Sequence, residues 1–492
     1  MTPNQKLNHK VDIPICKNNE TLFDALKVLN RVGKGIVFIV NEDEKLCGLL
    51  TDGDIRRLFL GENDLQTLLK NVLSPEFVYG SVLQTHEEIR TLLNQKIKII
   101  PLVDRDMKIV DYAEYLPEIH IPITQPDLNG NELKYLTEAF LSTWISSTGP
   151  YITRFENDFS KYCGVNHGVA VSNGTVALHL ALLALGIGPG DEVVVPDLTF
   201  AATINAVLYT GATPVIVDVE EDSWCIDPQE FQKAITKKTK AVIPVHLYGQ
   251  PCDMYKIMKI AGNHGVHVIE DCAEAHGAIF KDQRVGSFGI INCFSFYGNK
   301  IITTGEGGMC VTNSSDLTEK MRTLRDHGMS RKQKYWHETI GYNYRMTNLQ
   351  AAIGCAQLER IDELLNRREE IENTYRRQLR EISFVEFQRN DLPHRKKVTW
   401  LVSALVKEDR RETVCEKLRA QKIDVRYFFY PLSKMDIYKK YTFSNENSLK
   451  LSEMGINFPT SGKLPGSELI EILSSEIKRR EKFNAVENTI GT

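Results

Sequence analysis

The sequence predicts an α/β protein with a mostly parallel central sheet that helices cover on both faces. Seven short apolar runs alternate with helical stretches between residues 169 and 312, which is the order of βα units that build such a sheet. Residues 371–492 mix strand and helix patterns and predict a small α+β domain. The first 120 residues differ in texture and contain an internal repeat, which predicts a separate α/β module.

Length and composition narrow the class of protein. The 492 residues correspond to about three structural units, and 42% hydrophobic with 25% charged residues is typical of a soluble globular protein. The formal charge of −4 argues against nucleic-acid binding, which usually leaves a basic stripe. No apolar run approaches the ~18 residues of a membrane span. Residues 1–10 lack an apolar signal region, so we expect a cytoplasmic protein.

The ten cysteines are scattered along the chain. They form no Cys-x-x-Cys motif and have no histidine at zinc-ligand spacing. We therefore expect reduced, mostly buried thiols and no bound metal.

The repeat in the N-terminal module has a period of 63 residues. This shift places residues 39–41 on 102–104 and residues 45–46 on 108–109. Two copies of a helix–strand–turn–strand unit predict a module with pseudo-twofold symmetry. In the first copy we expect a helix over 21–30, strands over 35–40 and 45–50, and a second helix from about residue 54.

The first copy ends in a stretch that suits a nucleotide. In residues 51–57 (TDGDIRR), a hydroxyl and a carboxylate open a helix that also carries two arginines. This stretch resembles a tandem CBS (Bateman) module, which implies a regulatory nucleotide at Thr51 and Asp54. The second copy has Glu114 and Pro117 instead. The alternative is that Asp54 only caps a helix and that the module only dimerises.

The domain boundaries follow from composition. Residues 1–117 form the module, and a proline-rich stretch over 118–126 reads as a linker. Residues 127–370 form the large domain and 371–492 the small one. Dense charge over 357–379 predicts a long helix that connects them.

The first chemical motif is a turn between a strand and a helix. The strand over 169–172 leads through Asn173, Gly174 and Thr175 into an apolar helix over 176–185. Backbone amides at a helix N-terminus, together with the glycine and the hydroxyl, suit a phosphate. A plain capped turn would have the same sequence.

The second motif is an acidic pair, Glu270 and Asp271, that follows an apolar strand. One of these carboxylates can face a protonated ring nitrogen. Alternatively, both cap the next helix or pair with lysine or arginine.

The third motif contains Lys300, which follows an apolar strand. It lies between Gly298 and the loop 303–308 (TTGEGG), close to Ser295. This context favours a lysine that forms a Schiff base over an ordinary surface cation. A reactive lysine, a carboxylate for a pyridinium nitrogen and a phosphate site are together what pyridoxal phosphate (PLP) requires.

From about residue 121, the chain resembles the DegT/DnrJ/EryC1/StrS family of nucleotide-sugar aminotransferases. The resemblance rests on four motifs in the family's order. It implies the fold type I architecture of aspartate aminotransferase, with PLP as cofactor and pyridoxamine phosphate in the second half-reaction. The motifs are residues 196–203 (PDLTFAAT), 270–277 (EDCAEAHG), 295–308 (SFYGNKIITTGEGG) and 341–352 (GYNYRMTNLQAA).

This resemblance assigns roles around the cofactor ring. Lys300 matches the covalent lysine, and Asp271 matches the partner of the pyridine nitrogen. Phe200 matches the aromatic residue stacked on the ring. Glu274 stands where the family more often has glutamine near the ring hydroxyl.

The same resemblance assigns the phosphate site. Gly174, Thr175 and Ser295 match phosphate binders. Asn343 matches a residue that reaches the phosphate from the neighbouring subunit, which implies a homodimer with shared active sites.

Within the family, the chain is most similar to GDP-perosamine synthases. This implies amino transfer from L-glutamate to GDP-4-keto-6-deoxymannose, for a surface polysaccharide such as the lipopolysaccharide O-antigen. A UDP-linked 4-keto sugar is the alternative substrate, and a non-catalytic sensor of PLP or nucleotide is the alternative class. Ser147, His246, Arg345 and Tyr430 are candidate substrate contacts, for which an ordinary core or hydrogen-bonding role is the alternative.

Overall fold

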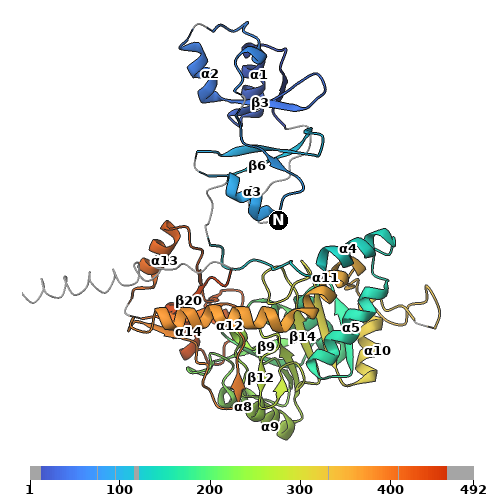
Figure 1. The fold of residues 1–492 in the computed structure, drawn as a ribbon. Coiled ribbons are helices and arrows are strands. Elements are labelled where there is room, and N and C mark those ends of the chain that lie inside the picture. Colours follow the sequence, from blue (N-terminus) through green and yellow to red (C-terminus); the bar gives the residue numbers. More distant parts are fainter. Residues whose placement is uncertain are drawn as a thin grey trace, which may run out of the picture. The chain divides into compact units, whose positions relative to one another are not determined.

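The computed structural model describes residues 13–461 except 62, 75, 95, 116–120, 331 and 408. The chain divides into two units, residues 1–120 and 121–492. Each unit has its own hydrophobic clusters, and each is described separately below (Figure 1).

The N-terminal unit contains two three-stranded sheets of the same topology. In each sheet the first strand pairs in parallel with the second, which pairs antiparallel with the third. The register shifts after Ile39 in one copy and after Leu102 in the other, a separation of 63 residues. The duplication is therefore confirmed. The strands are β1 (Ile15–Lys17), β2 (Ile36–Val40), β3 (Leu46–Thr51), β4 (Gly80–Ser81), β5 (Ile99–Val103) and β6 (Ile109–Glu114).

The two copies also pack against each other within this unit. Lys45 and Lys108 form an antiparallel bridge, and the Leu46 amide donates to the Met107 carbonyl at 2.8 Å. Phe38 and Val103 belong to one shared cluster. The helices are α1 (Leu22–Val32), α2 (Asp52–Phe59), η2 (Leu69–Asn71) and α3 (His86–Leu92).

The second unit is built on a seven-stranded sheet in the order β7-β15-β14-β11-β10-β8-β9. Only β15 runs antiparallel to its neighbours, so the other six strands end at the same edge. All seven predicted strands are present. They are β7 (His167–Val171), β8 (Glu192–Pro196), β9 (Thr213–Val217), β10 (Thr239–Val242), β11 (His267–Asp271), β14 (Ile291–Ser295) and β15 (Gly308–Thr312).

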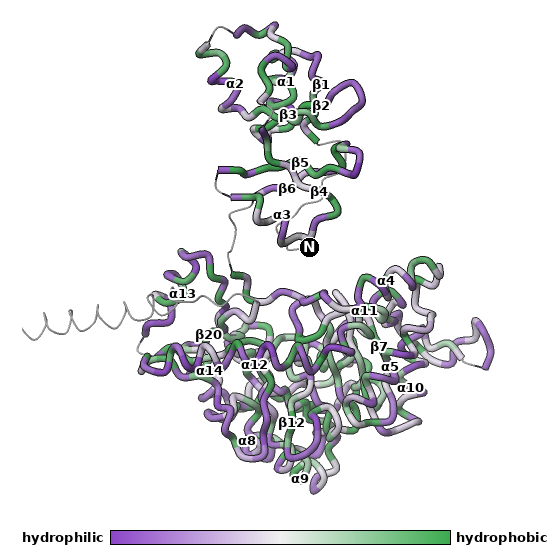
Figure 2. Tube along the Cα trace, in the orientation of Figure 1, coloured by the Kyte–Doolittle hydropathy of each residue, from purple (hydrophilic) through white to green (hydrophobic). Residues whose placement is uncertain are grey.

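Helices cover both faces of this sheet, as predicted. Along β7, Ala170 packs in one core cluster while Val169 and Val171 pack in the other, which is the period-two alternation of a strand. The central strands are hydrophobic, whereas α12 is largely hydrophilic (Figure 2). One face carries α5 (Pro150–Cys163), α8 (Pro228–Ala234), α9 (Met254–His264) and α11 (Asn348–Glu359), and the other carries α6 (Gly174–Ala184), α7 (Ala202–Tyr209) and α10 (Ser315–Arg325).

The small domain is an antiparallel sheet with helices, in the order β16-β18-β20-β19. Its cluster contains Tyr375 and Phe458, whose rings stack. The elements are α12 (Ile361–Gln378), β16 (Val385–Phe387), β18 (Val402–Val406), α13 (Arg411–Ala420), β19 (Arg426–Tyr427), α14 (Glu446–Met454) and β20 (Gly455–Phe458). The remaining elements are α4 (Glu132–Leu141), η3 (Leu247–Gly249), β12 (Ile279–Phe280), β13 (Gln283–Arg284), β17 (Arg395–Lys396), η4 (Leu432–Lys434) and η5 (Lys439–Tyr441).

Two segments have different bounds in the structure from those that the sequence predicts. The predicted helix over 357–379 is interrupted at Arg360, whose φ of −111° leaves the helical region and whose side chain binds Asp127 and Glu363. The predicted linker over 118–126 is shorter. Ile121 bridges to Ile423 and Ile123 is buried in the core of the second unit, while Pro117 lies outside the described residues.

The cysteines match the expectation of reduced, mostly buried thiols. All ten cysteines are free, and nine are buried. Among the described helices, none is long and apolar enough to cross a membrane.

Candidate active site

The site lies at the edge of the large sheet where its parallel strands end. Asp271 ends β11 and Ser295 ends the neighbouring strand β14. Gly308 begins the antiparallel strand β15 opposite Ser295, and Gly174 opens α6 directly after β7. The topology therefore brings the three predicted motifs to one edge, where open α/β sheets bind ligands.

Lys300 lies in the turn after β14, and its side chain is only 12% exposed. Its Nζ is 3.6 Å from Glu274 Oε1 and 3.9 Å from the centroid of the Trp400 ring. Burial lowers the pKa of Lys300, and the carboxylates of Glu274 and Asp271 oppose this shift. A buried amine of lowered pKa suits a nucleophile.

Asp271 is held by two hydrogen bonds. Thr203 Oγ1 donates to Oδ2 at 2.9 Å, and the Ala273 amide donates to Oδ1 at 3.1 Å. Burial raises the pKa of Asp271, while both hydrogen bonds and the Lys300 charge lower it. The carboxylate is therefore fixed in direction and can face a cationic ring nitrogen.

A narrow cradle forms between the ends of β7 and β14. A Cβ on Gly174 would lie 2.7 Å from Ser295 Cβ, and a Cβ on Gly308 would lie 2.4 Å from the Asn173 carbonyl oxygen. Asn173 caps α6 by accepting from the Val176 amide at 3.0 Å. Thr175 lies half-buried in the first turn of this helix. Amides and hydroxyls around two glycines provide the donors that a phosphate needs.

Glu274 is buried between Lys300 and the turn that contains Tyr248. The Tyr248 amide donates to Glu274 Oε2 at 2.8 Å. Tyr248 has a φ of 52° and a ψ of 26°, a left-handed conformation that is uncommon for residues other than glycine. The Tyr248 hydroxyl accepts from the Phe429 amide at 3.0 Å, which fixes this turn.

Several predicted residues do not join this cluster. The ring of Phe200 is 58% exposed and contacts Phe429, and Tyr430 is 59% exposed. Asn343 is exposed and accepts from Arg345, which also binds Asp326 at 2.7 Å. Ser147 is half-buried before α5. The assigned roles of these residues stay predictions.

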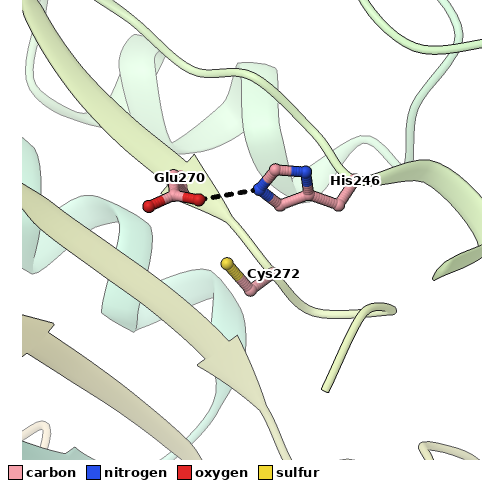
Figure 3. Close-up of side chains that lie close together, drawn as sticks. All are labelled: His246, Glu270 and Cys272. Carbon is pink, nitrogen blue, oxygen red and sulfur yellow. Dashed lines mark hydrogen bonds and ion pairs between the residues drawn. The ribbon is translucent and has the colours of Figure 1, made fainter. Parts of the chain in front are cut away.

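His246 has the core role that was its alternative interpretation. It is fully buried, and its Nδ1 accepts from the Cys252 amide at 3.1 Å. The proton is thus assigned to Nε2, which lies 2.9 Å from Glu270 Oε2 (Figure 3). With both ring nitrogens engaged inside the core, His246 has no free atom for a substrate.

Glu270 serves as an anchor rather than as a helix cap. Besides His246, its two oxygens accept from the amides of Gly286, Phe288 and Gly289 at 2.7–2.9 Å. The ligand-type atoms of His246, Glu270 and Cys272 lie within 4.8 Å of one another. Since four donors already occupy the carboxylate, this cluster fixes the end of β11 by hydrogen bonds, and we assign no metal to it.

Sequence reasoning missed two residues near Lys300. Trp400 stacks near the amine, and its Nε1 donates to the Asn299 carbonyl at 2.7 Å. Arg368 donates to the Trp400 carbonyl at 2.8 Å and to the Lys300 carbonyl at 3.4 Å. Both residues lie far from the motifs along the chain, and nothing in their local sequence signals the contact.

These residues fit PLP. A buried amine, a directed carboxylate and a glycine-lined cradle at a helix N-terminus match the carbonyl, ring nitrogen and phosphate of that cofactor. Lys300 would bind it covalently, Asp271 would hold its ring nitrogen, and Gly174, Thr175 and Ser295 would hold its phosphate.

Comparison with known proteins supports this interpretation. The model of the DegT/DnrJ/EryC1/StrS aminotransferase family matches residues 126–475. The chain belongs to this family. It is accordingly a PLP-dependent aminotransferase with the fold type I architecture. The model of the CBS domain matches residues 8–61, which cover the first copy of the N-terminal repeat.

Named relatives match nearly their whole length. The GDP-perosamine synthase of Escherichia coli O157:H7 is 45% identical over 357 residues, covering 72% of this chain and 97% of the relative. The GDP-perosamine synthase of Caulobacter vibrioides is 45% identical over 366 residues, with the same two shares covered.

Solved structures agree on the fold. The aminotransferase from Psychrobacter cryohalolentis superposes with a TM-score of 0.68 at 30% identity, covering 72% of this chain and 98% of that one. Spr1654 from Streptococcus pneumoniae in its PLP form gives a TM-score of 0.68 at 28% identity, covering 72% and 97%.

The cradle predicts the effect of one added methyl group. Gly174→Ala places a Cβ against Ser295 and narrows the space for the phosphate, so PLP affinity is expected to fall about tenfold or more, or about 1.4 kcal/mol. Fluorescence titration of the apoprotein with PLP measures this loss. Gly262→Ala in α9 is the control because no atom lies within 4 Å of the added Cβ. Equal affinity in both variants would contradict the cradle.

The directed carboxylate predicts a second loss. Asp271→Asn keeps the shape of the side chain but removes the negative charge, so kcat is expected to fall about 10²-fold while PLP remains bound. Asp218→Asn is the control, because Asp218 is a buried carboxylate in the same domain that accepts from the Asn447 and Ser448 amides. Near-normal turnover by Asp271→Asn would remove Asp271 from its role.

Proposed function

We propose that the protein transfers the amino group of L-glutamate to the 4-keto carbon of a nucleotide-linked 4-keto-6-deoxy sugar. The preferred substrate is GDP-4-keto-6-deoxymannose, and the product is GDP-perosamine for a surface polysaccharide. The observation that carries this proposal is the 45% identity to two GDP-perosamine synthases over 97% of their length. The ten free thiols support a cytoplasmic location.

The arrangement of Lys300 and Asp271 supports the chemistry. PLP, when bound, supplies a ring that withdraws electrons from the carbon that loses its proton. Lys300 Nζ would hold the cofactor covalently, and its amine would move the proton as general base and acid. Asp271 keeps the ring nitrogen protonated, and Thr203 keeps this carboxylate in place.

Exposed apolar side chains support a homodimer with shared sites. Monomeric soluble proteins rarely expose many large apolar side chains in one region. In this protein, four exposed apolar residues belong to α4 and the turn after it. A fifth, Ile340, precedes the segment that contains Asn343. Their exposed fractions are 74% for Leu133, 65% for Phe140, 74% for Leu141, 56% for Trp144 and 85% for Ile340.

A substrate panel tests the proposal. The purified protein, loaded with PLP and supplied with L-glutamate, is expected to aminate GDP-4-keto-6-deoxymannose with the highest kcat/KM. Formation of 2-oxoglutarate and of the amino sugar is followed by mass spectrometry. Preference for a UDP-linked 4-keto sugar would replace the substrate, and inertness toward the whole panel would favour a sensor.

Removal of the amine tests the role of Lys300. Lys300→Ala is expected to lose the visible absorbance of the covalently bound cofactor and at least about 10²-fold in turnover. Lys256→Ala is a matched control, since Lys256 is an exposed lysine of the same domain. Wild-type rates in Lys300→Ala would refute the assignment.

We also propose one regulatory nucleotide site per chain, at Thr51 and Asp54. Asp54 accepts from the Thr51 amide at 2.8 Å and pairs with Arg57, so it completes the capping box in which Thr51 is the N-cap of α2. In the second copy, Glu114 occupies the register position of Thr51 and pairs with Lys34 at 2.8 Å. Ligand binding changes activity only if it discriminates between two states of the protein.

Calorimetry with AMP, GMP, GDP, CMP and UDP tests this site. Asp54→Ala is expected to abolish binding of the nucleotide that the wild type binds. Asp24→Ala is the matched control, because Thr21 and Asp24 form the same capping box on α1. The two variants lose the same half of a capping box, the N3 carboxylate. If neither the wild type nor the control binds any nucleotide, and deletion of residues 1–117 leaves the kinetics unchanged, the module serves only for dimerisation.

A further inference from the structure

The carboxyl group of Glu274 lies against the Lys300 amine. Oε1 lies 3.6 Å from Lys300 Nζ, and Oε2 accepts from the Tyr248 amide. The Glu274 residue is 4% exposed. A glutamine could accept the same amide hydrogen bond, but it could not take up a proton. The presence of a carboxyl group here therefore has a chemical consequence.

Burial shifts the proton affinities of the two groups toward each other. It raises the pKa of Glu274 to about 7, although the Lys300 charge opposes this shift, and it lowers the pKa of Lys300. Two groups in contact that shift toward each other titrate as a pair. The neutral pair therefore lies closer in free energy to the ionised pair than it would in water.

Several neighbouring side chains enclose this pair. Trp400 covers the amine on another side, and the strained turn at Tyr248 fixes the carboxyl group. Other titratable groups nearby also act on the proton shared by Lys300 and Glu274. Asp271 favours the ammonium, and burial keeps the pKa of His276 low, at about 3. Two more titratable groups lie near the pair, Tyr248 and Arg368. Burial and the Glu274 charge raise the pKa of Tyr248, and burial lowers the pKa of Arg368 to about 10.

We propose that Glu274 is the proton partner of Lys300. The ammonium of Lys300 and the carboxylate of Glu274 become a neutral amine and a carboxylic acid when one proton moves between them, and the reverse transfer restores the ion pair. Glu274 thereby stores the proton that Lys300 releases when its amine must act as nucleophile or base. This inference rests on the role of Lys300 in the proposed function.

Glu274→Gln tests the pair directly. The full-length protein is loaded with pyridoxamine phosphate, which leaves the Lys300 amine free, and acetylation of Lys300 by acetic anhydride is followed by peptide mass spectrometry against pH. Loss of the carboxylate removes a charge that favours the ammonium, so the pKa of Lys300 falls. Acetylation at neutral pH is expected to be about tenfold faster. Turnover is expected to be about tenfold slower, because the stored proton is lost.

Faster acetylation of Lys300 together with slower turnover would distinguish proton exchange from a purely structural role of Glu274. A structural role would leave the titration of Lys300 unchanged. Glu372→Gln is the control, since Glu372 forms another buried pair with Lys397 at 2.6 Å and is expected to alter neither Lys300 acetylation nor the pH dependence of turnover. Glu274→Asp retains a carboxyl group and is expected to restore part of both effects.

Infrared difference spectra of the wild type provide a measurement without substitution. A buried carboxylic-acid C=O band that appears when Lys300 becomes neutral supports the transfer. Unchanged acetylation and pH profile in folded Glu274→Gln, or absence of this band, would overturn the inference. The proposed function would fail by other results, namely an inert substrate panel or an active Lys300→Ala. Neither of these results changes what acetylation reports about the coupling between Glu274 and Lys300.

Discussion

The burial of the Lys300 amine beside two carboxyl groups is the constraint on which the site depends. Removing these groups from water costs free energy, and close partners offset that cost only if geometry is fixed. Here Thr203 and the Ala273 amide fix Asp271, and the Tyr248 amide fixes Glu274. The same burial lowers the pKa of Lys300. The arrangement that costs free energy on folding is therefore the one that makes the amine reactive.

The sheet supplies the required rigidity. Six parallel strands end at one edge, so Asp271, Ser295 and the start of α6 converge although they are far apart in sequence. Glu270 reinforces this edge, because a single carboxylate gathers three loop amides and His246 behind Asp271. The small domain completes the site through Trp400, and Arg368 ties α12 to both Trp400 and Lys300.

Sequence reasoning found what is encoded locally. The period-two strands, the capped turn at Asn173 and the 63-residue repeat are local patterns, and the structure contains all of them. It could not find Trp400 or Arg368, whose contacts arise only in the tertiary fold. It also could not choose between roles for His246, because a histidine after a strand has the same sequence whether it faces a substrate or a buried Glu270. The break at Arg360 was missed because no glycine or proline marks it in residues 357–363.

Identification of the lysine that carries the cofactor tests the central claim most directly. Borohydride reduction of the PLP-loaded protein fixes the cofactor on the lysine to which it is bonded, and peptide mass spectrometry locates it. The account predicts one modified peptide, which contains Lys300 between the sheet edge and the loop 303–308. Modification of any other lysine, or none in an active protein, would contradict it.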